Sequence, residues 1–132
     1  MQNIHYSVKP VVETLANQTA ATVNGAAIDR IGFDDIELVV ATGAASGTPT
    51  SYTVDCKLQG SDDGSTNWTD LSVATTQITA DSTIKKAKVA NAYLKNRYIR
   101  TVTVVAFVGG TTPAVPVLAQ VLLGMAQNEP VA

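Results

Sequence analysis

Apolar and polar residues alternate most regularly within residues 50–59. Tyr52, Val54, Cys56 and Leu58 fall on one side of an extended chain, and serine, threonine, glutamine and charged residues fall on the other. A period of two is typical of a strand with one buried face, so we predict a half-buried β-strand here. Cys56 is then a small core residue rather than a nucleophile, because no basic neighbour is visible that would lower the pKa of its thiol.

A second pattern spans residues 101–128, which include no Asp, Glu, Lys, Arg or His. A glycine pair and a proline interrupt this stretch, so it lacks the roughly 20 continuous apolar residues that a membrane-spanning helix requires. We predict two strands instead, at 101–108 and 114–125, joined by a Gly-Gly-Thr-Thr-Pro loop.

The predicted strand 114–125 is apolar on both faces. Leu118 and Leu122 lie on one face, and the opposite face carries Val115, Val117, Ala119, Val121, Leu123 and Met125. A strand that exposes one face to solvent normally alternates apolar with polar residues. We therefore predict that one face packs in the core of the domain and that the other contacts a partner protein.

Weaker strand patterns recur along the rest of the chain, at residues 6–12, 20–23, 27–31, 36–41, 67–71, 74–78 and 84–89. Asn24-Gly25 favours a hairpin between the second and third of these. No long stretch has the 3.6-residue period of an amphipathic helix, and no linker divides residues 1–132. About eight antiparallel strands in one domain indicate an all-β sandwich, and eight strands in two sheets are typical of a jelly roll.

The composition is unusual because few residues are charged. Only 15% of the residues are charged, against about 25% in an average soluble domain, whereas an apolar content of 45% is ordinary. A surface with few charges loses little solvation free energy when a partner covers it. The net charge of -2 argues against a nucleic-acid partner, which would require a basic stripe. We expect the one basic cluster, Lys85, Lys86 and Lys88, to be solvated.

Residues that carry chemistry are few. His5 is the only histidine and Cys56 the only cysteine, so neither belongs to an acid–base pair, a nucleophilic triad or a metal-ligand cluster. We therefore expect neither an enzyme nor a cofactor. Asp62-Asp63-Gly64 resembles part of a calcium loop, but it lacks the alternating ligands and the terminal Glu of an EF-hand, and a tight turn requires the same residue types. We predict a turn.

The two ends of the chain are expected to act as arms. Residues 1–14 comprise an N-terminal arm and the first strand, and residues 126–132 form a C-terminal tail. Chain ends are ordered only where something holds them, so we expect neighbouring subunits to hold these. The first five residues lack the features of a signal peptide, so secretion is not expected. The candidate interface residues are apolar positions of the arms and of the last strand: Ile4, Tyr6, Val8, Leu118, Leu122 and Val131.

Three segments together resemble a known family: residues 25–35 (GAAIDRIGFDD), residues 58–71 (LQGSDDGSTNWTDL), and Arg97-Tyr98-Ile99-Arg100. In this order and spacing, the chain is similar over nearly its whole length to the jelly-roll cement, or decoration, proteins of tailed double-stranded-DNA bacteriophages. The resemblance implies a non-enzymatic homo-oligomer, a dimer or else a trimer, made in the host cytoplasm. It would sit on the outer capsid surface and bridge subunits of the major capsid protein, with no nucleic-acid or membrane partner.

The segments 62–68 and 97–100 also resemble discoidin-type carbohydrate-binding modules. Such modules stack exposed aromatic side chains on sugar rings, whereas aromatic residues make up only 5% of this chain. Tyr52, Trp68 and Tyr98 are expected to be structural from their strand positions. A third interpretation is that the protein is another structural component of a phage, in its tail or neck.

Overall fold

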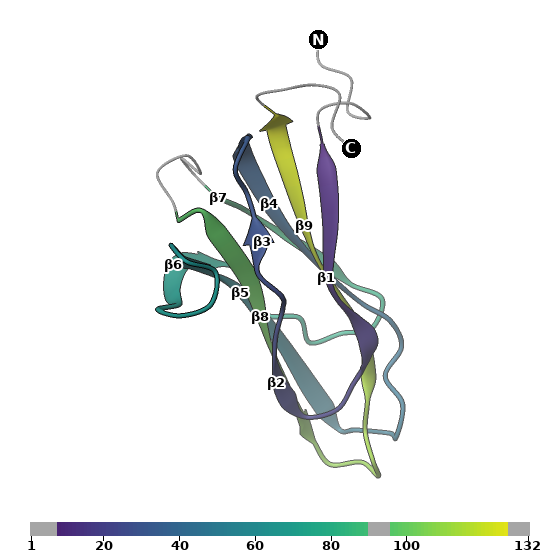
Figure 1. Ribbon diagram of the computed structural model, residues 1–132. Helices are drawn as coiled ribbons and strands as arrows, with labels where there is room; N and C mark the ends of the chain where they lie inside the picture. The colour runs from purple at the N-terminus through teal and green to yellow at the C-terminus, as the bar shows by residue number, and fades with distance from the viewer. Residues whose placement is uncertain (1–7, 90–95, 127–132) are drawn as a thin grey trace.

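The computed structural model describes residues 8–89 and 96–126, which form nine strands and no helix (Figure 1). Within these ranges, the structure thus contains no helix that could cross a membrane. The strands are β1 (Lys9–Gln18), β2 (Ala21–Asn24), β3 (Ile28–Asp29), β4 (Phe33–Thr42), β5 (Ser51–Ser61), β6 (Thr69–Ala74), β7 (Ile84–Val89), β8 (Tyr98–Val108) and β9 (Val115–Ala126).

The strands form two antiparallel sheets that pack against each other, which confirms the predicted all-β sandwich. One sheet has the order β1-β9-β4-β7, and the other has the order β2-β8-β5-β6 with β3 also paired to β8. The pairs are nested: the first strand pairs with the last, β2 with β8, β4 with β7, and β5 with β6. Among the described strands, only β2–β3 and β5–β6 follow one another within one sheet, and every other connection crosses between the sheets.

The inner faces of the two sheets build one core from alternate residues. Ile36, Leu38 and Leu58 have no exposed surface, and the inner face of β9 is buried from Val115 to Leu123. The predicted alternation in β5 is confirmed, since all four of its apolar positions are buried. Cys56 is a core residue, and burial raises the pKa of its thiol to about 11.

The first strand differs from its predicted position. The sequence predicts a strand at 6–12, whereas β1 spans Lys9–Gln18. The apolar pattern misleads here because β1 lies at a sheet edge and buries only Thr14 fully. Its position is determined by pairing with β9, and a bulge interrupts that pairing between Val12 and Thr14.

Two further expectations from the sequence are wrong. Asn24-Gly25 does not close a hairpin, because β2 and β3 both pair with β8 and not with each other. The amide of Gly25 instead donates a hydrogen bond to the carbonyl oxygen of Thr101. The predicted strand 74–78 is reduced to the end of β6 and an isolated bridge between Ile78 and Val54.

Candidate protein-interaction surface

An apolar row crosses all four strands on the outer face of the β1-β9-β4-β7 sheet. The strand register pairs Leu15 with Leu118, Leu118 with Ala41, and Ala41 with Ile84. Leu15 is 74% exposed and Ile84 is 66% exposed, although both are aliphatic. We call these four residues the apolar row. A soluble domain rarely exposes contiguous aliphatic side chains without a binding role.

The two neighbouring rows toward the start of β1 extend this apolar character on one side of the sheet. In order across the sheet they comprise Val12, Gln120, Val39 and Lys86, then Pro10, Leu122, Glu37 and Lys88. Val12 is itself 54% exposed. Three of the four apolar residues of these rows lie on β1 and β9, and the fourth, Val39, lies on β4. The charged residues lie on β4 and β7.

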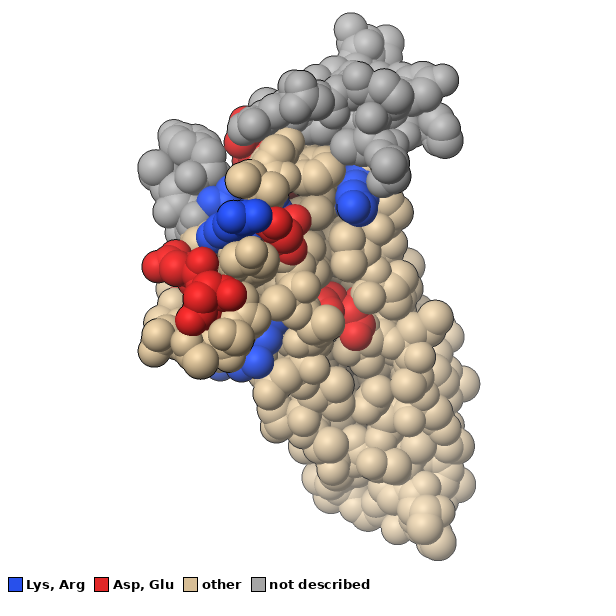
Figure 2. All heavy atoms as spheres, in the orientation of Figure 1, with Lys and Arg blue, Asp and Glu red and all other residues tan. Residues whose placement is uncertain are grey.

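The charges on this outer face are paired with one another. Lys86 Nζ lies 3.7 Å from Glu37 Oε1, and Lys88 Nζ lies 3.6 Å from Asp35 Oδ1. Exposed pairs of this kind contribute at most about 1 kcal/mol to stability. Their effect here is to leave the outer face without net charge. On the side of the molecule that Figure 2 shows, the charged side chains lie in the upper part and the lower part has none.

An open hollow of about 450 Å³ lies beside the apolar row. Leu15, Leu118 and Pro116 stand around it, and Ala41 and Gly43 leave the space because their side chains are small or absent. The hollow is mainly apolar and open to solvent. It is therefore suited to a side chain of a partner protein rather than to an enclosed small molecule.

Leu118 and Leu122 lie on the outer face, as the two-sided pattern of the last strand predicts, opposite the buried Val117 and Val121. Val8 is half-buried just before β1. The other three predicted interface residues, Ile4, Tyr6 and Val131, lie outside the described residues. Their role stays a prediction.

Leu15, Val12 and Ile84 complete this surface, but the sequence patterns do not single them out. Ile84 stands between two polar residues, Leu15 lies between Thr14 and Ala16, and Val12 follows Val11. Only the strand register joins the three to Leu118 and Leu122.

No family model, curated protein or solved structure matches this chain. A functional interpretation therefore depends on the surfaces of the sandwich and on the sequence resemblance.

The predicted turn after β5 is confirmed, and the Asp63 carboxylate organises it. Ser61 Oγ and the amides of Ser65 and Thr66 donate hydrogen bonds to Asp63 Oδ1 over 2.8, 2.9 and 2.8 Å. The hydroxyl of Thr66 donates a hydrogen bond to Asp63 Oδ2. This bond contributes most to lowering the pKa of the Asp63 carboxyl far below its usual range. Within residues 8–89 and 96–126, no three His, Cys, Asp or Glu side chains gather as metal ligands.

Gly64→Val is expected to lower the free energy of unfolding by on the order of 1–2 kcal/mol, because Gly64 has a φ of +76° that strains any other residue. An added Cβ would also lie 3.0 Å from Cγ of Tyr98. Urea denaturation measures the change. Gly32→Val is the matched control for strain alone, since Gly32 has a φ of +88° and no atom within 4 Å of an added Cβ. Millimolar calcium should leave the melting temperature unchanged, and a rise of several degrees would contradict a turn without metal.

Trp68 and Tyr98 are each in contact with an arginine. The Arg100 guanidinium lies 4.4 Å from the centroid of the Trp68 ring, and its Nε and Nη2 donate to Gln59 Oε1 over 3.0 and 2.9 Å. Arg97 lies 5.2 Å from the centroid of the Tyr98 ring. One face of each ring is thus already occupied, and Tyr52 is only 6% exposed. This arrangement weighs against stacking of these rings on sugars.

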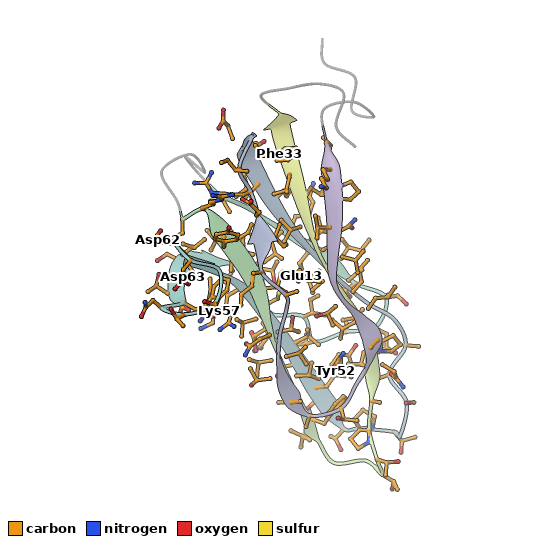
Figure 3. All side chains as sticks on the ribbon, in the orientation of Figure 1. Glu13, Phe33, Tyr52, Lys57, Asp62 and Asp63 are labelled. Carbon is orange, nitrogen blue, oxygen red and sulfur yellow. The ribbon has the colours of Figure 1, made fainter. Side chains whose placement is uncertain are left out.

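One carboxyl enters the seam between the two sheets (Figure 3). Glu13 lies at the bulge of β1, and the amide of Thr101 donates a hydrogen bond to its Oε1 over 3.4 Å. Gly25 packs so closely that an added Cβ would lie 2.5 Å from Glu13 Oε2. Burial raises the pKa of Glu13 to about 7, although the Thr101 and Ala26 amides and the charge of Arg100 favour the ionised form.

Proposed function

We propose that this protein is a non-enzymatic structural component of a virion, which binds the outer surface of a tailed-phage capsid and stabilises it by bridging major capsid subunits. The apolar row is the observation that carries the proposal. The inner faces of both sheets already supply the core, so an aliphatic row on the outer face is best explained by contact with another protein.

The nested strand pairs support the jelly-roll part of this proposal. In a jelly roll, one long antiparallel hairpin is wound up so that the first strand lies beside the last and the middle strands form the innermost pair. The order of β1-β9-β4-β7 against β2-β8-β5-β6 fits that winding. This order supports the proposed relation to the decoration proteins that the three sequence segments resemble.

The physical requirements of capsid stabilisation suit this surface. Burial of apolar area supplies roughly 25 cal/mol per Å², and the low charge of the outer face limits the opposing cost of desolvation. A protein bound at many equivalent positions of a shell needs only moderate affinity at each position, because linked contacts raise the effective concentration. The proposed role requires neither catalysis nor a cofactor.

The ends of the sandwich support a role for the arms. β1 begins at Lys9, which pairs with Leu123 near the end of β9. The described part of the chain therefore begins and ends at the same end of the sandwich, and we propose that the arms attached there reach the same neighbouring subunits. In this proposal Ile4, Tyr6 and Val8 anchor the N-terminal arm, and Val131 anchors the C-terminal tail.

Truncated chains that start at Pro10 or end at Gly124 are expected to fold but to bind shells more weakly than the full chain, because few core positions lie in the removed segments. Particles that carry them should release DNA earlier on heating or at low salt. Co-sedimentation with undecorated shells measures the binding, and thermal unfolding checks the fold. Full-strength binding by both truncated forms would contradict the arm hypothesis.

A further inference from the structure

We infer that Glu13 is a pH-sensitive switch, which fastens the edge of one sheet to the edge of the other at acidic pH and releases it as the pH rises above neutral. The opening is local, and it does not depend on the proposed function. The strand register, the packing and the charges around the seam that Glu13 enters support it.

Two irregular strand edges face each other across this seam. β1 and β2 are edge strands of different sheets, and the bulge of β1 lies at Glu13. On the other sheet, β2 ends where Asn24 pairs with Val102, and β3 begins where Ile28 pairs with Ile99. Three residues of the chain between β2 and β3 thus stand opposite two residues of β8. Such irregularities redirect side chains and often occur at functional positions.

The Glu13 carboxyl lies between these two edges and joins them (Figure 3). Thr101 lies in the part of β8 that neither β2 nor β3 pairs with, and its amide donates a hydrogen bond to Glu13 Oε1 over 3.4 Å. The amide of Ala26 also donates to this carboxyl. A side chain of β1 therefore supplies acceptors where the pairing of the other sheet is interrupted. Gly25 leaves room for it, since an added Cβ would lie 2.5 Å from Glu13 Oε2.

The charged groups around Glu13 do not compensate its ionisation. Arg100 of β8 is the cation that acts on it, but this guanidinium is bound to Gln59 and lies over the Trp68 ring. Cys56 of β5 also interacts with Glu13, and burial keeps its thiol neutral by raising its pKa to about 11. β9 and the chain between β2 and β3 contain no titratable residue. Within the described residues, no ion pair includes Glu13.

The polar groups beside Glu13 also solvate an ion poorly. The hydroxyls of Thr14 and Thr101 are buried next to it and have no hydrogen-bond partner among the described residues. Lys9, the other charged residue of β1, is exposed at the start of the strand. Burial therefore raises the pKa of Glu13 to about 7, and the ionised carboxyl gains free energy by moving into water. The preference for the closed seam is fully present below pH 4.5, the pKa of an ordinary glutamate, and is lost as the pH rises through about 7.

Hydrogen exchange of the full chain at about pH 5 and about pH 8 tests the switch. Relative to an unstructured chain at the same pH, the amides of Ala26 and Thr101 should exchange about tenfold faster or more at the higher pH. They should then be almost unprotected. The amides of Leu38 and Val40 should stay protected, because β4 remains paired on both sides. Glu13→Gln should keep Ala26 and Thr101 protected at both pH values.

Gly25→Ala should open the seam at every pH, because the added Cβ would displace the flexible end of the Glu13 side chain. Carbon NMR of the Glu13 carboxyl should then show titration near the ordinary 4.5, whereas the wild type titrates at about 7. Gly124→Ala is the matched control and should behave like the wild type, since its added Cβ would lie 3.7 Å from Asp35 Cβ, an ordinary contact.

Three results would overturn the inference. The first is equal residual protection of the amides of Ala26, Thr101, Leu38 and Val40 at the higher pH, which would make the opening global. The second is a loss of protection that persists in Glu13→Gln. The third is a Glu13 carboxyl that titrates at the same pH in the wild type and in Gly25→Ala. None of these measurements involves shells, so their outcome leaves the proposed function untouched.

Discussion

Replacement of both Leu118 and Leu122 by Asp is expected to leave a monomer, or a protein that no longer attaches to shells. Both side chains lie on the outer face of β9, where a partner would have to desolvate the two new carboxylates. Leaving one buried charge unpaired typically costs about 3–5 kcal/mol, so two such charges should weaken the contact strongly. The solution mass and co-sedimentation with shells measure the effect.

The control for this double variant is Val104→Asp, a change at an exposed position of the other sheet. It should leave both self-association and attachment intact. The inner face of β9 is not altered in the double variant, so its sandwich should stay folded. If that variant remains oligomeric and still decorates shells, the assignment of faces is wrong.

Glu13 is expected to make the stability of the protein depend on pH. Its pKa is about 7 in the folded protein, against an ordinary value of 4.5, so the folded state binds the proton more tightly than the unfolded state does. The resulting stabilisation is fully present below pH 4.5 and is lost as the pH rises through about 7. Because the carboxyl is only half-buried, we expect a loss of about 2 kcal/mol rather than the full value of the shift.

Urea denaturation of the wild-type chain and of Glu13→Gln, from acidic to mildly alkaline pH, measures this dependence. Glu13→Gln should remove most of the loss of stability and should be the more stable protein above neutral pH. Glu37→Gln, on the outer face, is the matched control and should retain the wild-type profile. If the free energies of unfolding of the wild type and of Glu13→Gln changed with pH in parallel, the Glu13 carboxyl would not be the group that causes the pH dependence.

Several strand bounds could be predicted from the sequence. The predicted bounds of β7 and the end of β8 agree with the structure, and the start of β5 is displaced by one residue. In β5, which alternates most regularly, one face must be apolar for the core to close, so the local pattern carries the information. β1 could not be placed in this way, because an edge strand that is largely exposed carries little alternation.

The candidate surface was predictable only in part. Leu118 and Leu122 are visible in the sequence because their strand is apolar on both faces. Leu15, Ala41 and Ile84 become their neighbours through pairings between distant segments of the chain. The buried position of Glu13 depends on a bulge, which inserts one residue and which no local pattern announces.

Co-sedimentation of the intact chain with undecorated phage shells is the measurement that tests the proposed function most directly. We expect saturable binding at a fixed ratio to the shell subunits, with the Leu118→Asp, Leu122→Asp double variant left in the supernatant. No binding of the intact chain to shells would contradict it. Retention on immobilised sugars instead would favour the carbohydrate-binding module, and attachment to tails alone would favour a tail or neck component.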